Sequence, residues 1–231
     1  MNWLKKFRWI TILIVTGSNL LYLAPASIAQ PQWDVQGLRR INQNHSPSVD
    51  DVVHYWETTA TPMMAMPIGL YLWGAKTNDA KLKDAALLTA SAEFITLSAV
   101  YLLKYIVNRQ RPFRELNGIR KLGDAKSPSF PSAHAAGAFA LATSLTLEYP
   151  KTWIRVTALL WATGIAYGRI YQGMHYPSDV LVGTFVGAST AWILHHYKKS
   201  WLNFLQHHLS LQITWTQNEQ RLIFLQQLPL F

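Results

Sequence analysis

The sequence predicts an all-α protein: a bundle with a core of roughly five to six helices, transmembrane or soluble, followed by a short C-terminal hairpin. One observation is a series of apolar segments at residues 62–75, 85–107, 134–148, 152–167 and 179–197. They are long enough for helices, and none has the strict apolar–polar alternation of a strand. The other is that half of the 231 residues are apolar and only 14% are charged, as expected when most helix faces are covered.

Residues 1–29 have the three parts of an export signal. A basic stretch, MNWLKKFR, precedes the apolar run WITILIVTGSNLLYL, and the small residues Ser27 and Ala29 fit a cleavage site. Cleavage after Ala29 would leave a mature chain that begins at Gln30. The stretch from Trp9 to Ala29 is also just long enough to cross a bilayer, so an uncleaved signal anchor is the alternative. Either form predicts a protein of the cell envelope.

Three further regions follow this signal. Residues 30–60 are polar, and "VQGLRRINQN" and "SVDDVVHYWETTA" are typical of two short amphipathic helices, the second capped by Ser48. Residues 61–199 contain all the apolar segments and should form the helical domain that carries the chemistry. In the tail, residues 200–231, "LQITWTQNEQRLIFLQ" alternates around a polar centre, which predicts a hairpin.

Charge and segment length favour different environments for the bundle. With a cytoplasmic N-terminus, one side of the membrane receives Lys5, Lys6, Arg8, Lys76, Lys81, Lys83, Lys151, Lys198 and Lys199, which fits six crossings. The other side also carries many basic residues, in 104–126 and at Arg169, and these would serve a substrate. Against a membrane, the mean hydropathy is only +0.06. Only 85–107 comfortably reaches the roughly 20 residues that a span needs. It contains Glu93, which is functional if the helix crosses a membrane and a surface residue if the bundle is soluble.

Two clusters of polar residues lie at predicted helix ends. Lys104 and Arg111 are seven residues apart, so they share one face of a helix that should end before the following proline. Ser132 is a good N-cap, with Ala133 and His134 opening the next helix. The free N–H groups of that first turn and the positive end of the helix dipole would face an anion.

A third cluster lies in "GRIYQGMHYPSD". Asp179 follows His175 by four residues, where a carboxylate can accept from Nδ1–H and leave Nε2 with its lone pair. Arg169 adds a planar guanidinium suited to phosphate oxygens. An up-and-down bundle brings all three clusters to one end, so a cationic pocket is expected there. The absence of cysteine excludes thiol catalysis and Cys-ligated metal sites.

In order and spacing, these clusters resemble the motifs of the type 2 phosphatidic acid phosphatase and vanadium haloperoxidase superfamily. The motif K-x6-R-P corresponds to Lys104 through Pro112, P-S-G-H to Pro131 through His134, and S-R-x5-H-x3-D to Gly168 through Asp179. The resemblance covers about residues 60–197 and favours the phosphatase branch, because the haloperoxidases of the family are much longer chains.

Two residues depart from the family's motifs. Ala133 replaces the motif glycine and would be strained if that position required a positive φ. Gly168 replaces the motif serine, which removes a hydroxyl next to Arg169. Neither change removes the expected nucleophile, acid or cations, so both bear on rate or substrate preference more than on activity itself.

The resemblance implies a role for each residue of the pocket. His175 is the expected nucleophile, which forms a phosphohistidine, and Asp179 orients its imidazole. His134 is expected to protonate the leaving oxygen and then to activate water. The phosphate oxygens are expected to contact Lys104, Arg111, Ser132, the N–H of Ala133, and Arg169. No cofactor is expected, and because no carboxylate cluster suggests a metal site, a metal-independent enzyme is predicted.

The expected substrate is a phosphate monoester or diphosphate of a lipid, such as phosphatidic acid, phosphatidylglycerol phosphate, polyprenyl diphosphate or lipid A. The expected location is the inner membrane, with the active site on the periplasmic or outer face. The alternatives are a soluble periplasmic acid phosphatase for small phosphomonoesters, a haloperoxidase, and a non-catalytic envelope protein that binds anionic lipid. The net charge of +9 suits an anionic partner. Nucleic acid is disfavoured, because the basic residues are not interleaved with exposed aromatic residues.

Overall fold

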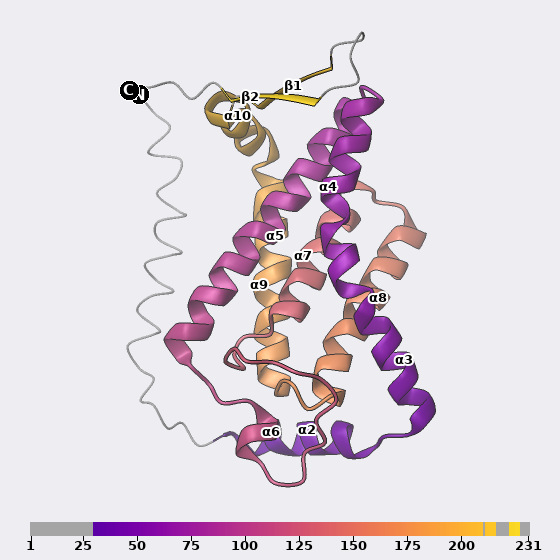
Figure 1. Cartoon of the computed structure of the whole chain (residues 1–231), viewed down its shortest axis with the longest axis vertical. Coiled ribbons are helices and arrows are strands. Elements are labelled where there is room, and N and C mark those ends of the chain that lie inside the picture. Colours follow the sequence, from indigo (N-terminus) through magenta and orange to yellow (C-terminus); the bar gives the residue numbers. More distant parts are fainter. Residues whose placement is uncertain (1–29, 210, 216–221, 227–231) are drawn as a thin grey trace.

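The long helices α4, α5, α7, α8 and α9 run up and down in one bundle in the computed structural model (Figure 1). The structure describes residues 30–209, 211–215 and 222–226, and the predicted signal in residues 1–29 lies outside them. The bundle helices are α4 (Ala60–Lys76), α5 (Ala80–Val107), α7 (Ala133–Glu148), α8 (Thr152–Tyr171) and α9 (Pro177–His196). Each contains one of the predicted apolar segments, so the predicted fold class is confirmed.

Helices α2 (Gln32–Gln43) and α3 (Pro47–Thr58) form from the polar lead-in. Helix α3 begins after Ser46, whose Oγ accepts from Val49 N at 3.4 Å, so the predicted cap at Ser48 is wrong. The reason is Pro47, which is suited to the first helical position and therefore moves the cap to the residue before it.

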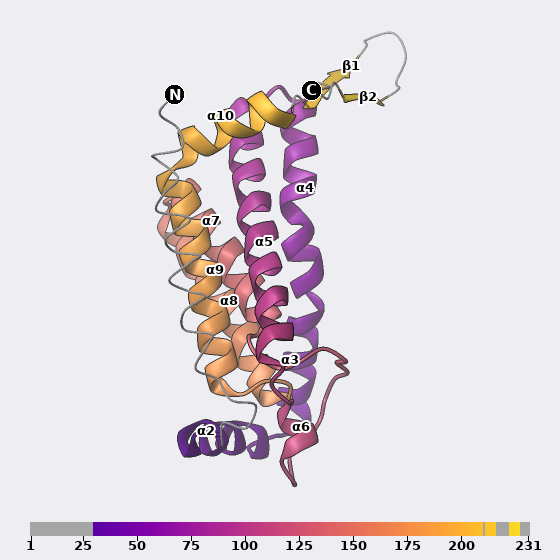
Figure 2. The same cartoon turned by 90° about the vertical axis from the view of Figure 1, so that its left-hand side faces the viewer.

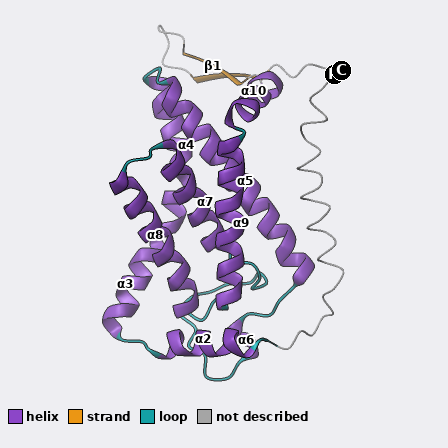
Figure 3. Cartoon of the chain, turned by 180° about the vertical axis from the view of Figure 1, so that it is seen from behind, coloured by secondary structure: helices purple, strands orange, loops and turns teal. Residues whose placement is uncertain are grey.

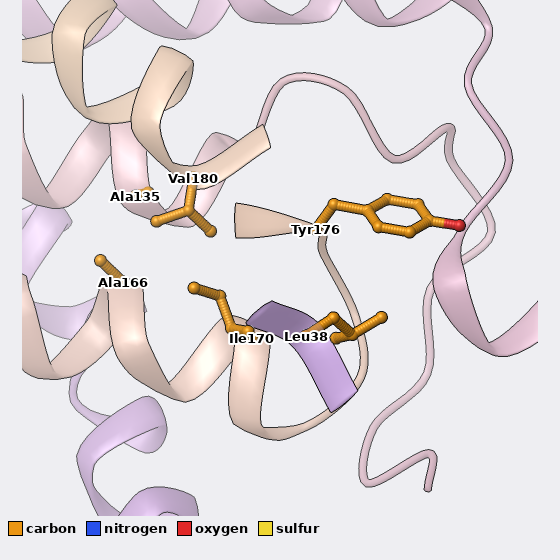
Figure 4. Packing of buried hydrophobic residues seen from close by; sticks show 6 residues of the cluster. All are labelled: Leu38, Ala135, Ala166, Ile170, Tyr176 and Val180. Atoms are coloured by element: carbon orange, nitrogen blue, oxygen red, sulfur yellow. The ribbon is translucent and has the colours of Figure 1, made fainter. Parts of the chain in front are cut away.

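Helix α2 lies across one end of the bundle (Figures 1 and 2). Its Leu38 is fully buried and packs in a cluster with Ala166 and Ile170 of α8 and Val180 of α9 (Figure 4). Burying one leucine side chain is worth roughly 2 kcal/mol, which helps to hold α2 against the helix ends.

Helices α7 and α9 approach each other closely, because glycines of α9 face the backbone of α7. A Cβ at Gly183 would lie 2.5 Å from Ser132 O, and a Cβ at Gly187 would lie 2.0 Å from Ala136 O. Any larger residue at either position would push the two helices apart. This contact fixes the beginning of α7 beside the beginning of α9.

The end of the bundle away from α2 carries α10 (Lys198–Leu209) and a hairpin (Figures 1 and 2). Strands β1 (Leu211–Trp215) and β2 (Leu222–Gln226) pair antiparallel, with Leu211 opposite Gln226 and Trp215 opposite Leu222. The predicted hairpin is therefore confirmed.

Large apolar side chains cover part of the outer surface of the bundle. Phe94 on α5 is 73% exposed and Phe185 on α9 is 72% exposed. Among the described residues, one helical stretch, Ala80–Glu115, is long and apolar enough to cross a membrane.

Candidate active site

The three sequence clusters meet at the end of the bundle that α2 covers (Figure 3). The C-terminal ends of α5 and α8 and the N-terminal ends of α7 and α9 all point to this end, as does the short helix α6 (Pro112–Glu115). Most of the predicted site residues are buried here, at 5% exposure or less: Lys104, Arg111, Ser132, Arg169, His175 and Asp179. Ala133 and His134, in the first turn of α7, are partly exposed.

His175 lies between an acceptor and a donor. Its Nδ1 is 3.4 Å from Asp179 Oδ2, and its Nε2 is 3.3 Å from a terminal nitrogen of Arg111. A carboxylate accepts and a guanidinium donates, so the proton belongs on Nδ1 and the lone pair on Nε2. Burial lowers the pKa of His175 to about 3, although the neighbouring Asp179 acts to raise it. The imidazole is therefore neutral at neutral pH, as a nucleophile must be.

The turn between α8 and α9 places this histidine. The backbone N–H groups of Met174 and His175 both donate to Arg169 O, at 3.1 and 3.2 Å. Gly173 has φ +71°, and a Cβ there would lie only 2.5 Å from Arg120 O. Only glycine suits a position with both a positive φ and so little space.

The carboxylate of Asp179 is held by several donors. Its Oδ2 accepts from Ser129 Oγ at 2.5 Å and from Tyr176 N at 3.0 Å, and its Oδ1 accepts from Arg109 at 2.6 Å. Neither Ser129 nor Arg109 was among the predicted site residues. Their positions in the sequence could have indicated them. Arg109 lies within the K-x6-R-P motif, and Ser129 lies two residues before the P-S-G-H motif.

Lys104 and Arg111 are fixed by carbonyl groups of the loop before α7. Lys104 Nζ donates to Pro128 O at 2.8 Å and to Ser129 O at 3.2 Å. Arg111 donates through Nε to Ser127 O at 2.8 Å and through a terminal nitrogen to Met174 O at 3.0 Å. Arg111 is thus ordered beside His175, and Lys104 is held by the same loop.

The first turn of α7 forms as predicted. Ser132 Oγ accepts from Ala135 N at 3.5 Å, and Ser132 N donates to the backbone oxygen of Asp179 at 3.0 Å. Ala133 is helical, and the non-glycine residues with positive φ in the described chain are Asn78 and Asn108. Alanine in place of the motif glycine is therefore unstrained.

The second departure from the motifs, Gly168, is explained by packing. A Cβ at Gly168 would lie 3.3 Å from Val53 Cγ1 of α3, so a serine would be tight there. Arg169 next to it is buried, but its guanidinium pairs with Glu57 of α3 and donates to Gln172 Oε1 at 3.2 Å. In the described part of the chain, its side-chain partners are therefore Glu57 of α3 and Gln172 at the end of α8, and neither Lys104 nor Arg111 is among them.

A polar cavity of about 250 Å³ adjoins Arg111. Its basic lining residues are Arg109, Arg111, Arg114 and Lys126, and it has no acidic lining residue. The cavity extends the positive surface outward from the buried cations.

Comparison with known proteins gives a family and relatives. A model of the PAP2 superfamily matches residues 82–202. The chain is 34% identical over 99 residues to the lipid A 4'-phosphatase of Bacteroides thetaiotaomicron, covering 40% of this chain and 44% of that protein. It is 32% identical over 202 residues to the undecaprenyl-diphosphatase of Sulfolobus acidocaldarius, covering 87% of this chain and 90% of that protein.

A solved structure is also similar to the bundle. The crystal structure of Aquifex aeolicus LpxE superposes with a TM-score of 0.60 at 26% identity, covering 72% of this chain and 96% of that chain. The match to the first relative thus spans less than half of that protein, whereas the second relative and this structure are matched over nine tenths or more of their length.

Proposed function

The chain belongs to the PAP2 superfamily, and on this premise we propose that it hydrolyses a lipid phosphate ester or diphosphate through a phosphohistidine intermediate. The names of its relatives, lipid A 4'-phosphatase and undecaprenyl-diphosphatase, support such a substrate. The observation that carries the proposal is the position of His175, whose ring nitrogens lie beside Asp179 and Arg111.

In the first step, Nε2 of His175 attacks phosphorus, a P–N bond forms and the P–O bond to the leaving group breaks. The Nδ1–H of the imidazole donates to Asp179, 3.4 Å away, which stabilises the positive charge that develops on the ring. His134 gives its proton to the leaving oxygen. The neutral state of buried His175 makes its lone pair available for this attack.

In the second step, water attacks the phosphohistidine and the P–N bond breaks. His134, now neutral, accepts a proton from that water, and phosphate leaves with His175 restored. His134 is partly exposed at the first turn of α7. Burial of its ring and the nearby cations Arg111 and Lys104 lower its pKa, which favours the neutral base of this second step. An anionic substrate offsets those cations when His134 acts as the acid of the first step.

Charge on the transferring phosphoryl group is stabilised by donors that are already ordered. Lys104 and Arg111 supply two cations, and Ser132 with the N–H of Ala133 supplies the positive end of α7. Arg169 would add a third cation after releasing Glu57 to face the substrate. These groups can supply the stabilisation that a metal ion gives in other phosphatases, so we propose metal-independent turnover. Activity that survives exhaustive treatment with a chelator would support this.

We also propose that the protein lies in the inner membrane with this site at the outer face. The export signal in residues 1–29 and the exposed apolar surface support this placement. Fractionation with N-terminal sequencing tests it. A soluble mature chain that begins at Gln30 would contradict it and would favour small phosphomonoesters as substrates.

The central experiment measures phosphate release by the purified full-length chain. The substrates are phosphatidic acid, a polyprenyl diphosphate and a small aryl phosphate. We expect His175→Ala to abolish release from all of them. His195→Ala is the matched control, because His195 pairs with Glu148 in the part of the bundle nearer α10. Substantial activity in His175→Ala, or lipid binding without turnover in the wild type, would rule out the proposed mechanism.

A further inference from the structure

Helix α2 lies outside the residues that match the family, yet it reaches into the site. Its Asp34 is fully buried. Asp34 Oδ1 accepts from Ser178 N at 2.8 Å, and Asp34 Oδ2 accepts from Ser178 Oγ at 2.5 Å. The carboxylate therefore binds the first turn of α9, one residue before Asp179.

Arg109 joins this carboxylate to the site. One terminal nitrogen lies 2.7 Å from Asp34 Oδ2, and the other lies 2.6 Å from Asp179 Oδ1. The guanidinium also stacks on the ring of Tyr176, with 3.9 Å between the guanidinium carbon and the ring centroid. A planar guanidinium with two carboxylates and an aromatic face is held in one orientation.

The two oxygens of Asp179 have separate partners around this bridge. Arg109 binds Oδ1, while Oδ2 remains for His175, Ser129 and the backbone of Tyr176. Without the guanidinium, two buried carboxylates would lose their shared cation, and Asp179 could rotate its oxygens away from the imidazole.

We propose that Arg109 is a positioning residue for the His175–Asp179 pair and that Asp34 holds Arg109 in place. Helix α2 is then part of the catalytic apparatus. The inference rests on the proposed function for the measurements of kcat and KM, but not for the measurement of vanadate affinity. Vanadate adopts the geometry of the transferring phosphoryl group and binds a nucleophilic imidazole, so its affinity tests the same geometry without turnover.

The test uses the full-length protein with Arg109→Gln, Arg109→Lys and Asp34→Asn. The measurements are kcat and KM, the Kd for vanadate from tryptophan fluorescence, and thermal unfolding. We expect Arg109→Gln to lower kcat by about tenfold or more and to weaken vanadate binding in parallel, with KM changed by less than about threefold. Arg109→Lys keeps the positive charge but lacks the planar guanidinium that binds two carboxylates at once. It should therefore lose less kcat and less vanadate affinity than Arg109→Gln. Asp34→Asn should give a smaller loss of the same kind.

A matched control separates positioning from simple stabilisation. Asp50 of α3 forms a bidentate pair with Arg120, at 2.8 and 2.5 Å, near the same end of the bundle. Its contacts in the described structure lead to Arg120 and Tyr171, not to Asp179. Asp50→Asn should therefore lower thermal stability while leaving kcat and vanadate affinity unchanged.

A double variant completes the test. If Asp34 acts through Arg109, Asp34→Asn should add little to the loss in Arg109→Gln. If the losses in kcat and vanadate affinity of the two single variants add fully in the double variant, the inference is wrong. It is also wrong if Arg109→Gln is less stable but binds vanadate as tightly as the wild type does. Should Arg109→Gln not fold, Arg109→Lys and Asp34→Asn give the same readouts. If the wild type releases no phosphate, the proposed function fails, whereas vanadate affinity still decides between positioning and a purely structural ion pair.

Discussion

His175 is buried, and burial lowers its pKa from 6.5 to about 3. In the unfolded chain the same imidazole titrates near 6.5. Between these two values the unfolded state binds a proton that the folded state does not, so the free energy of unfolding falls as the pH falls through this window. The imidazole that we propose as the nucleophile therefore makes the fold less stable in acid.

This linkage is testable with His175→Asn, which removes the titrating group. Lowering the pH from about 7 to about 5 should reduce the Tm of the wild type more than the Tm of the variant. Thermal unfolding in detergent at both pH values measures the difference, and the other histidines are the same in both proteins. An equal loss of Tm would show that the imidazole of His175 is not kept neutral by burial.

Ser129 gives a second prediction at the scale of one residue. Its Oγ donates to Asp179 Oδ2 at 2.5 Å, and hydrogen bonds to charged groups are worth about 1.5–3 kcal/mol. Ser129→Ala should therefore lower kcat by about tenfold or more, with KM little changed. Ser91→Ala is the control, because among the described residues Ser91 Oγ donates to Leu87 O of the same helix, at 2.8 Å. A normal kcat in Ser129→Ala would mean that Asp179 needs no help from this hydroxyl.

The sequence alone indicates the residues that we propose for the chemistry, but not the residues that hold them. Lys104, His134 and His175 stand out because their types and spacing match phosphate chemistry. Glu57 carries no such signal, and Ser129 has only its place two residues before the P-S-G-H motif, since each acts through a side chain that is distant in the sequence. Glu57 contacts Arg169, 112 positions later, so only the packing of α3 on α8 shows this pair.

At the scale of elements, helix α3 supplies the carboxylate that pairs with Arg169. Glu57 pairs with the guanidinium that the phosphate is expected to need, and its carboxylate also accepts from Gln172. An entering phosphate must therefore compete with Glu57. The variant Glu57→Gln keeps a hydrogen-bonding group for Gln172 but removes the competing charge.

We expect Glu57→Gln to bind inorganic phosphate about three- to tenfold more tightly, since removing the carboxylate charge both frees Arg169 and relieves repulsion of the anion. The inhibition constant of phosphate, measured against the hydrolysed substrate, gives this directly. Glu115→Gln is the control, because Glu115 accepts from Tyr176 on the outer side of the site and does not contact Arg169. Weaker phosphate binding in Glu57→Gln would instead mean that Glu57 holds Arg169 in its productive position.

Element boundaries were predictable where the local chemistry is strong. Ser132 caps α7, and Pro177 begins α9, because a side-chain acceptor and a fixed φ act over a few residues. The place of α2 across the bundle end was not predictable, because it depends on tertiary contacts such as those of Leu38 and Asp34.

At the scale of the whole molecule, the site exists because the helix ends are held in register. Ser132 N donates to the backbone oxygen of Asp179 at 3.0 Å, which ties the beginning of α7 to the beginning of α9. Further along the same interface, away from the end covered by α2, the glycines of α9 lie against the α7 backbone. The separation of the two helices therefore sets the distance between the first turn of α7, proposed to bind phosphate, and the first turn of α9 beside His175.

Gly187→Ala tests this dependence. The new Cβ would lie 2.0 Å from the backbone oxygen of Ala136, and because backbone cannot rotate away, α7 and α9 must separate. We expect a loss of about 2 kcal/mol or more in stability, together with a loss of activity, although Gly187 touches no reacting group. Gly69→Ala in α4 is the matched control, since nothing lies within 4 Å of its added Cβ, and it should leave Tm and kcat unchanged. If Gly187→Ala lost stability but kept full kcat at a temperature where it is folded, the register of α7 and α9 would not control the site.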